Sequence, residues 1–189
     1  MRNSSGNNKE LFERIMLPHL EAAFNLARWL VNNRSDAEDI VQEAYLKAFR
    51  LFDSYADKNS HAWILAIVRN TTYTWLKQNK RFQLNKTLDD ESYLASEGPD
   101  SANNIAVMDP CEWQTLQSDI QGLYLAIDLL PLNMKEIIIL REIEGCSYRE
   151  LAEILDIPPG TVMSRVSRAR QSLQCVLKRE SIKEEAGEV

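Results

Sequence analysis

The apolar positions near the end of the chain follow a helical period in two neighbouring segments. Leu151, Ala152, Ile154 and Leu155 supply one face of the first segment. Ser147 and Glu150 stand at the S-x-x-E spacing of a capping box, which marks the start of this helix. The Pro-Pro-Gly sequence at 158–160 then ends it, because proline lacks an amide donor and its ring clashes with the preceding turn. Thr161 is a suitable N-cap for a second helix.

The helix expected from Thr161 has one apolar face and one basic face. Its apolar positions are Val162, Val166, Ala169 and Leu173. Its remaining surface carries Ser164, Arg165, Ser167, Arg168 and Arg170. Arginine can bond a guanine edge in bidentate fashion or hold a phosphate, and serine is small enough to permit close approach. The two segments predict a DNA-binding helix-turn-helix. The alternative, a solvated helix of an ordinary bundle, would normally mix acids with bases.

Helical periodicity also fills most of the chain before the acidic stretch that follows residue 86. Three such segments run over residues 10–32, 35–52 and 60–80. Pro18 marks a kink or a new helix start within the first of them. Ser35 and Glu38 form a second capping box. Residues 1–9 are polar, and we expect them to be frayed.

The rest of the chain divides into a segment without periodicity and a second helical part. Residues 82–118 hold Gly and Pro among acids, Ser and Asn, which is typical of a linker with little secondary structure. Helices resume near residue 119 and again at 132–144, where Gly145 is a suitable stop. No strand-like alternation appears. The sequence therefore predicts an all-α fold with two small helical domains. The domains are a three-helix domain at 10–81 and a four-helix domain ending in the helix-turn-helix at 119–177. An acidic linker at 82–118 joins them, and a disordered tail follows at 178–189.

Charge is unevenly distributed along the chain. The net charge of −6 over 189 residues argues, taken alone, against a nucleic-acid partner. However, residues 63–86 carry five bases and no acid, residues 87–128 nine acids and no base, and residues 161–179 five bases and no acid. Two basic segments separated by an acidic one indicate two surfaces that face nucleic acid, joined by a tether that avoids non-specific phosphate contacts.

Several classes of protein are not indicated by the sequence. Three cysteines (Cys111, Cys146, Cys175) and two histidines (His19, His61) show no metal-ligand spacing, so we expect no metal or cofactor, and thiols in a reducing cytosol. No apolar run approaches the ~20 residues of a membrane span, and the N-terminus has no signal-peptide core, which predicts a cytoplasmic protein. No catalytic motif stands out, so we do not expect an enzyme.

Three blocks of the sequence, in this order, resemble the signature sequences of a known family. They are SDAEDIVQEAYLKAFR at 35–50, AWILAIVRN at 62–70 and LLPLNMKEIIILREIEGCSYRELAEILDIPPGTVMSRVSRAR at 129–170. The chain resembles, from about residue 10 to 177, the bacterial sigma factors of the extracytoplasmic-function (ECF) group of the sigma-70 family. These proteins have regions two and four only, joined by a linker. The resemblance implies a dissociable, non-enzymatic subunit that gives core RNA polymerase its promoter specificity.

The resemblance also implies roles for three helices and for partners. The helix from residue 35 corresponds to the part that docks on the clamp helices of the polymerase's largest subunit, through Asp36, Glu38, Asp39, Gln42 and Glu43. The third helix corresponds to the region that recognises and melts the −10 element of promoter DNA, with Arg69, Asn70, Tyr73, Lys77, Lys80 and Arg81 as candidates. The final helix corresponds to the −35 reader, through Thr161, Ser164, Arg165, Ser167 and Arg168. Further implied partners are the flap of the second-largest subunit and, as for many members, an anti-sigma factor.

Two other functions remain open at this point. One is a stand-alone helix-turn-helix regulator whose N-terminal helices form a dimerisation or sensor domain. The other is a protein-binding adaptor that mimics a sigma factor without initiating transcription. The chain also departs from the family pattern, since Thr74 stands where the family often has Asp, and Met163 where a polar residue is common. These departures bear on which promoter sequence is read rather than on the class of protein.

Overall fold

The computed structural model describes residues 4–55, 59–86 and 122–187, and every regular element in these ranges is helical. The elements are α1 (Ser4–Met16), η1 (Leu17–His19), α2 (Leu20–Val31), α3 (Arg34–Leu51), η2 (Phe52–Ser54), α4 (Ser60–Lys86), α6 (Leu132–Ile138), η3 (Ile139–Ile143), α7 (Tyr148–Leu155) and α8 (Pro159–Gly187). Residues 122–128 are helical as well. The all-α class is confirmed. The predicted linker lies outside the described residues from residue 87 onward, as does Cys111.

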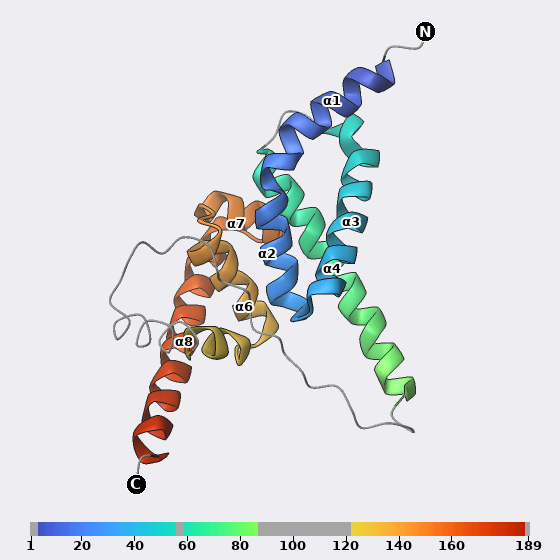
Figure 1. The fold of residues 1–189 in the computed structure, drawn as a ribbon. Helices are drawn as coiled ribbons and strands as arrows, with labels where there is room; N and C mark the ends of the chain where they lie inside the picture. Colours follow the sequence, from blue (N-terminus) through green and yellow to red (C-terminus); the bar gives the residue numbers. More distant parts are fainter. Residues whose placement is uncertain (1–3, 56–58, 87–121, 188–189) are drawn as a thin grey trace, which may run out of the picture.

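Helices α2, α3 and α4 pack against one another and form the first half of the molecule (Figure 1). Their contacting faces bury Ala23, Leu26, Ala27, Leu30, Ala37, Ile40, Val41, Ala44, Ala48, Ile64, Leu65 and Val68. Most of these positions follow the helical period of the sequence. Leu26, Ala37 and Leu65 were not among the predicted inward positions, and Phe49, which was, is 44% exposed. Pro18 lies in η1 and separates α1 from α2, as predicted. Helix α4 begins at Ser60, also as predicted, and runs six residues beyond its expected end.

The polar N-terminal residues are more ordered than the sequence predicted. Residues 4–9 belong to α1, so the expectation of a frayed segment is wrong for them. The ring of Phe12 on this helix lies edge-on to Phe49 and Phe52, with centroids 5.2 Å apart in both pairs. Such aromatic pairs contribute about 0.5–1.5 kcal/mol beyond the area they bury. These ring contacts anchor the C-terminal part of α1 to the rest of the first half.

Two asparagines make the junction between α2 and α3. Asn32 has a φ of 58°, the left-handed conformation that ends α2. The side-chain oxygen of Asn33 accepts a hydrogen bond from the backbone N–H of Asp36 at 3.0 Å, so Asn33 is the N-cap of α3. The predicted capping box at Ser35 and Glu38 is therefore wrong, because the helix already starts before Ser35.

The second half of the molecule begins with a helical run over residues 132–143. The sequence predicted this run as one helix, and its second part, η3, is π-helical. The N–H of Glu144 donates to the carbonyl of Ile139 at 2.9 Å, which closes the wider turn. Gly145 follows with a φ of 68° and ends the run, as predicted.

The capping box at the start of α7 is confirmed. The backbone N–H of Glu150 donates to Ser147 Oγ at 3.2 Å, and the Glu150 carboxylate accepts from the backbone N–H of Ser147 at 2.7 Å. Two backbone donors at the helix start are thereby satisfied. Asp156 ends α7 in the left-handed conformation, with a φ of 52°.

Helix α8 is longer than the sequence predicted at both ends. It begins at Pro159, before the predicted N-cap Thr161. Proline is well tolerated at the first helical position, because the N–H that it lacks would have no partner within the helix there. It continues to Gly187. Residues 178–187 therefore do not form the predicted disordered tail, and no proline or glycine interrupts them before Gly187.

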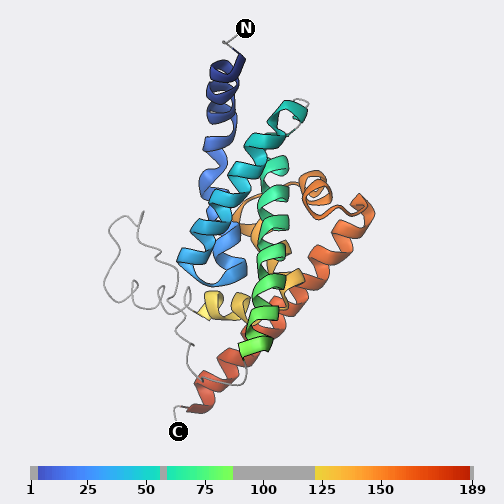
Figure 2. The same cartoon turned by 90° about the vertical axis from the view of Figure 1, so that its right-hand side faces the viewer.

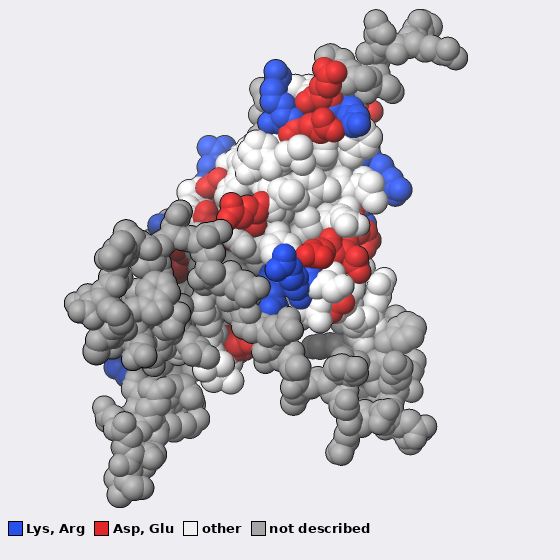
Figure 3. Space-filling view, in the orientation of Figure 1, with Lys and Arg blue, Asp and Glu red and all other residues white. Residues whose placement is uncertain are grey.

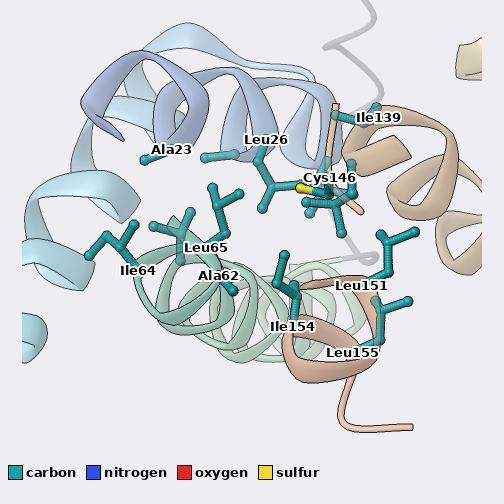
Figure 4. Packing of buried hydrophobic residues seen from close by; sticks show 14 of the residues in the cluster. Ala23, Leu26, Ala62, Ile64, Leu65, Ile139, Cys146, Leu151, Ile154 and Leu155 are labelled. Atoms are coloured by element: carbon teal, nitrogen blue, oxygen red, sulfur yellow. The ribbon is translucent and has the colours of Figure 1, made fainter. Parts of the chain in front are cut away.

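The two halves pack against each other, α4 on α7 and α2 on α6 (Figure 2). Buried apolar side chains from both halves belong to one continuous cluster. Figure 4 shows Leu26 of α2 and Ala62 and Leu65 of α4 beside Cys146 and Ile154 of the second half. At the edge of this layer, the rings of Trp29 and Tyr124 stack with centroids 5.0 Å apart. An apolar layer therefore joins the two helical halves.

Candidate nucleic-acid interface

Helix α8 presents the basic face that the sequence predicted. Val162, Val166 and Ala169 are buried within the second half, so the opposite side of the helix faces outward. Of the predicted −35 contacts, Thr161 is half-buried, and Ser164, Arg165, Ser167 and Arg168 are exposed. The side chain of Met163 is also exposed, at 64%, and adds an apolar group to this surface. The arrangement suits a helix that inserts polar side chains into a DNA groove.

Arg170 is separated from this basic face by an ion pair. Its guanidinium lies 2.7 Å from the carboxylate of Glu142 in η3, measured from Nη2 to Oε1, and its Nε donates to the same oxygen at 2.9 Å. The pair ties α8 to the preceding helical run. Arg170 is therefore engaged within the second half, although it is exposed and its position in the sequence groups it with Arg165 and Arg168.

The predicted −10 surface on α4 is partly occupied by the second half of the molecule. Arg69 forms a two-armed ion pair with Glu136 of α6, with Nε–Oε2 at 2.7 Å and Nη2–Oε1 at 3.2 Å. Its guanidinium also lies over the ring of Tyr73, 4.7 Å from the centroid. Glu136 is 1% exposed. The pair thus bridges the two halves at a site that excludes most water.

This environment changes the acidity of both α4 side chains. Burial raises the pKa of the Tyr73 hydroxyl, and the nearby Glu136 carboxylate raises it further. Burial alone would lower the pKa of Arg69, but the hydrogen bonds and charge of Glu136 outweigh it and raise that pKa. Both groups therefore hold their protons, and Arg69 stays charged.

The other predicted −10 residues lie along the same helix. Asn70 and Lys77 are exposed. Lys80 and Arg81 are within α4, but their side chains lie outside the described part of the chain. The sequence placed five of the six candidates on a helix expected to end near residue 80, and α4, which runs to Lys86, carries all six.

A cavity of about 500 Å³ lies between the two predicted DNA-contacting surfaces. Its lining consists of Arg69, Tyr73, Asn133, Met134, Glu136, Ile137, Arg165 and Arg168. Two candidates from α4 and two from α8 therefore face one cavity, an arrangement that the sequence did not predict.

The predicted polymerase-binding residues lie on the outer side of α3. Asp36 is half-buried, and Glu38, Asp39, Gln42 and Glu43 are exposed. Figure 3 shows acidic side chains gathered over this helix. Glu38 pairs with Arg34 at 3.1 Å, and Glu43 with Lys47 at 2.6 Å. Burial raises the pKa of Asp36, with a further contribution from Asp39, because like charges disfavour ionisation.

A second polar contact between the halves centres on the capping residue Glu150. Its Oε1 accepts a hydrogen bond from Asn59 Nδ2 at 2.8 Å and lies 3.4 Å from Nδ1 of His61. Asn59 also caps α4, since its Oδ1 accepts from the N–H of Ala62 at 3.3 Å. The start of α4 and the start of α7 are therefore held together by side chains that also cap them.

The Glu150 carboxyl provides a pH test of this contact. Burial alone would raise its pKa, but hydrogen bonds from Ser147, Asn59 and His61 lower it from the ordinary 4.5 to about 2. A pKa lower in the folded than in the unfolded protein contributes stability above pH 4.5 that is lost as the pH falls toward 2. We expect Glu150→Gln to be less stable than the wild type at pH 7, with the difference in urea midpoint shrinking between pH 4.5 and 2.

Glu153→Gln is the control for this variant. Glu153 lies on the same helix, and its contact is an exposed pair with Arg149 at 3.4 Å. It should leave the urea midpoint nearly unchanged at all pH values. A stability difference for Glu150→Gln that stays constant down to pH 2 would contradict the assigned hydrogen bonds.

Three other expectations from the sequence concern cysteine, metal and membrane. Cys146 is buried, and burial raises the pKa of its thiol to about 12, while Cys175 is exposed. Within the described ranges, no group of three or more His, Cys, Asp or Glu side chains could hold a metal ion. None of the described helices is long and apolar enough to cross a membrane.

Known proteins with similar sequences and structures share one family. The model of sigma-70 region 2 matches residues 15–82, and that of sigma-70 region 4 matches residues 120–173. The ECF RNA polymerase sigma-E factor of Haemophilus influenzae is 34% identical over 144 residues, 75% of each chain. The sigma-E factor of Escherichia coli K12 is 34% identical over 140 residues, 73% of this chain and 72% of that protein. The sigma factor RpoE of Bartonella quintana, solved with the anti-sigma factor NepR, gives a TM-score of 0.69 at 30% identity, covering 88% of this chain and 96% of RpoE.

These matches argue against the stand-alone regulator that the sequence left open. Both region models match in the order that the resemblance implied, one on each helical half. A stand-alone regulator is not favoured, because the relatives match across both halves and are sigma factors. The chain therefore belongs to the ECF group of the sigma-70 family, and is a non-enzymatic sigma factor that directs RNA polymerase to promoters.

Proposed function

We propose that this sigma factor reads promoter DNA with two surfaces, α8 at the −35 element and α4 at the −10 element, while α3 binds core polymerase. The observation that carries this proposal is the division of α8 into a buried apolar side and an exposed side with Arg165 and Arg168. A helix with this division can be held rigidly by its own domain while its arginines reach base edges. We place the region 2 domain at residues 10–81 and the region 4 domain at 119–177.

For the −35 element, we assign the base and phosphate contacts to the outer side of α8. The assigned residues are Thr161, Ser164, Arg165, Ser167 and Arg168. The arginines supply bidentate contacts to guanine or charge-assisted contacts to phosphate, and the short hydroxyl side chains allow the backbone to approach. Met163 would offer an apolar contact, for example to a thymine methyl group.

For the −10 element, we assign Arg69, Asn70, Tyr73, Lys77, Lys80 and Arg81 of α4. Strand opening exposes bases that can leave the stack and lie against an aromatic ring, while cationic side chains hold the backbone. Tyr73 provides the ring and Arg69 a nearby cation, because the two side chains already contact each other.

For core polymerase, we assign two surfaces. The acidic side of α3, with Asp36, Glu38, Asp39, Gln42 and Glu43, would dock on the clamp helices of the largest subunit. A mainly apolar groove of about 390 Å³ between residues 129–134 and α8 would receive the flap of the second-largest subunit. Charged faces set the orientation of such contacts, and apolar grooves supply affinity.

We further expect an anti-sigma factor and a cytoplasmic location. The Bartonella quintana relative was solved in complex with an anti-sigma factor, which supports the first expectation. Bacterial transcription takes place in the cytoplasm, which supports the second.

Run-off transcription with purified core polymerase tests the proposal. The template would be a library with randomised −35 and −10 segments, because the promoter sequence is not known. We expect transcripts that depend on this protein, and their templates should become enriched in one motif at each segment. Binding to duplex DNA without polymerase, and no transcripts, would favour a stand-alone regulator. Core binding without transcripts would favour an adaptor.

A further inference from the structure

We propose that the cavity between α4, α6 and α8 binds a small phosphate monoester with an aromatic or other apolar body, the class to which nucleoside monophosphates belong. The three helices together line a volume of about 500 Å³. Small-molecule sites typically have volumes of roughly 300–1,000 Å³. This inference goes beyond the proposed function and does not depend on it, because it concerns a ligand of the free protein and not the recognition of a promoter.

The charge of the cavity favours a dianion. Three arginines and one glutamate are the charged members of the lining, which gives it a net charge of +2. Arg69 and Glu136 offset each other in their 2.7 Å ion pair. Arg165 and Arg168 supply the excess, since neither forms an ion pair with any of the described residues. A phosphate monoester carries a charge of about −1.5 to −2 at pH 7, whereas each phosphodiester of a DNA strand carries one negative charge.

The two arginines of α8 are arranged to hold one phosphate. Arg165 and Arg168 are three residues apart on the helix, so their side chains are neighbours, with Cβ atoms about 5–6 Å apart. Both side chains are exposed, and a planar guanidinium directs parallel N–H donors at two oxygens of a phosphate. We therefore place the phosphate of the ligand on the α8 side of the cavity.

The opposite wall suits the body of the ester. Ile137 of α6, which is 3% exposed, and the half-buried ring of Tyr73 of α4 both line the cavity. The guanidinium of Arg69 lies 4.7 Å from the centroid of that ring and helps to hold it in place. Asn133 adds an exposed amide that can donate and accept hydrogen bonds. Apolar walls with a few directional polar groups are typical of small-molecule sites.

Isothermal titration calorimetry of the full-length protein with AMP tests the inference. AMP has both a dianionic phosphate and an aromatic base. Adenosine lacks the phosphate, inorganic phosphate lacks the body, and cyclic AMP has the same base on a phosphodiester with a single charge. We expect AMP to bind about 10-fold more tightly than each of these three compounds, because each of them lacks a charge-assisted or an apolar contact that AMP makes.

Variants of the two arginines test where the phosphate lies. Arg165→Gln and Arg168→Gln should each weaken the binding of AMP by about 10-fold, the effect of losing a hydrogen bond to a charged group. Saturating AMP should raise the urea midpoint of the wild type and leave that of the double variant unchanged, because a ligand stabilises only the state that binds it.

Arg149→Gln is the matched control for the arginine variants. It makes the same change on α7, where the side chain of Arg149 is 90% exposed and lies outside the lining of the cavity. It should leave the affinity for AMP at the wild-type value. A loss equal to that of Arg165→Gln would show that AMP responds only to the overall charge of the protein, and would overturn the inference.

Asn133→Asp tests whether the ligand lies inside the cavity. It adds a negative charge to the lining and leaves every arginine in place, so AMP should bind about 5-fold more weakly or worse. Wild-type affinity for this variant would overturn the inference, since AMP would then bind along the outer side of α8. Equal binding of AMP and inorganic phosphate, or no binding of AMP, would overturn it as well. None of these results alters run-off transcription by the wild type, which tests the proposed function separately.

Discussion

Arg165→Ala and Arg168→Ala each reduce initiation from a −35-dependent promoter by about 5-fold to 150-fold, since a bidentate base contact contributes roughly 1–3 kcal/mol. The reason is structural: both side chains are exposed on the outer face of α8, and the positions behind them are buried. Arg165→Ala should not change the affinity for core polymerase, because Arg165 lies neither on the acidic side of α3 nor in the apolar groove assigned to the flap. Run-off transcription and a fluorescence titration of core polymerase measure the two quantities.

Arg170→Ala is the matched control for these variants. It removes an arginine from the same helix, but the exposed guanidinium of Arg170 is already paired with Glu142 at 2.7 Å. Exposed pairs of this kind contribute little, so initiation should stay within about twofold of the wild type. An equal loss in core affinity for Arg165→Ala would contradict the role assigned to α8.

Ile64→Ala lowers the free energy of unfolding by about 2–5 kcal/mol, the range for removing a large aliphatic side chain from a well-packed core. Ile64 lies on α4 and is 0% exposed. It packs in the three-helix core, where the surrounding helices leave little room to collapse around the void. Urea denaturation followed by far-UV circular dichroism measures this loss as a lower midpoint.

Leu46→Ala is the control for the core variant. It shortens an aliphatic side chain that is 59% exposed on α3, so the expected change is within about 0.5 kcal/mol. A midpoint for Ile64→Ala as close to the wild type as that of Leu46→Ala would show that α4 does not pack as described.

Most helices and several of their ends could be predicted from sequence because they depend on local rules. The periods of apolar residues found the packed faces of α2, α3, α4, α7 and α8. Ser147 and Gly145 mark helix ends through hydrogen bonds or φ values that involve only near neighbours. The cap at Asn33 was missed for a related reason: Asn and Ser are both good N-caps, and the spacing alone favoured Ser35.

The interdomain part of the site could not be predicted, because its partners are far apart in the chain. Lys135 and Glu136 are charged residues that a helical pattern assigns to the solvent. They are 7% and 1% exposed, since Lys135 pairs with Asp128 at 2.6 Å and Glu136 pairs with Arg69. Glu136 is satisfied by a residue 67 positions away, which leaves no local signal, and Lys135 by a residue seven positions away on the preceding helical segment, so the sequence missed the role of both.

The apolar layer between the halves also limits how the protein can be rebuilt from parts. Leu26 and Leu65 of the first half and Cys146 and Ile154 of the second belong to one buried cluster. A chimaera that fused residues 1–86 to the second half of another sigma factor would need side chains of matching shape at the latter two positions. Without them, the hybrid would expose apolar surface and tend to aggregate. The layer therefore ties the two modules together as a matched pair, even though we assign each its own contact with DNA.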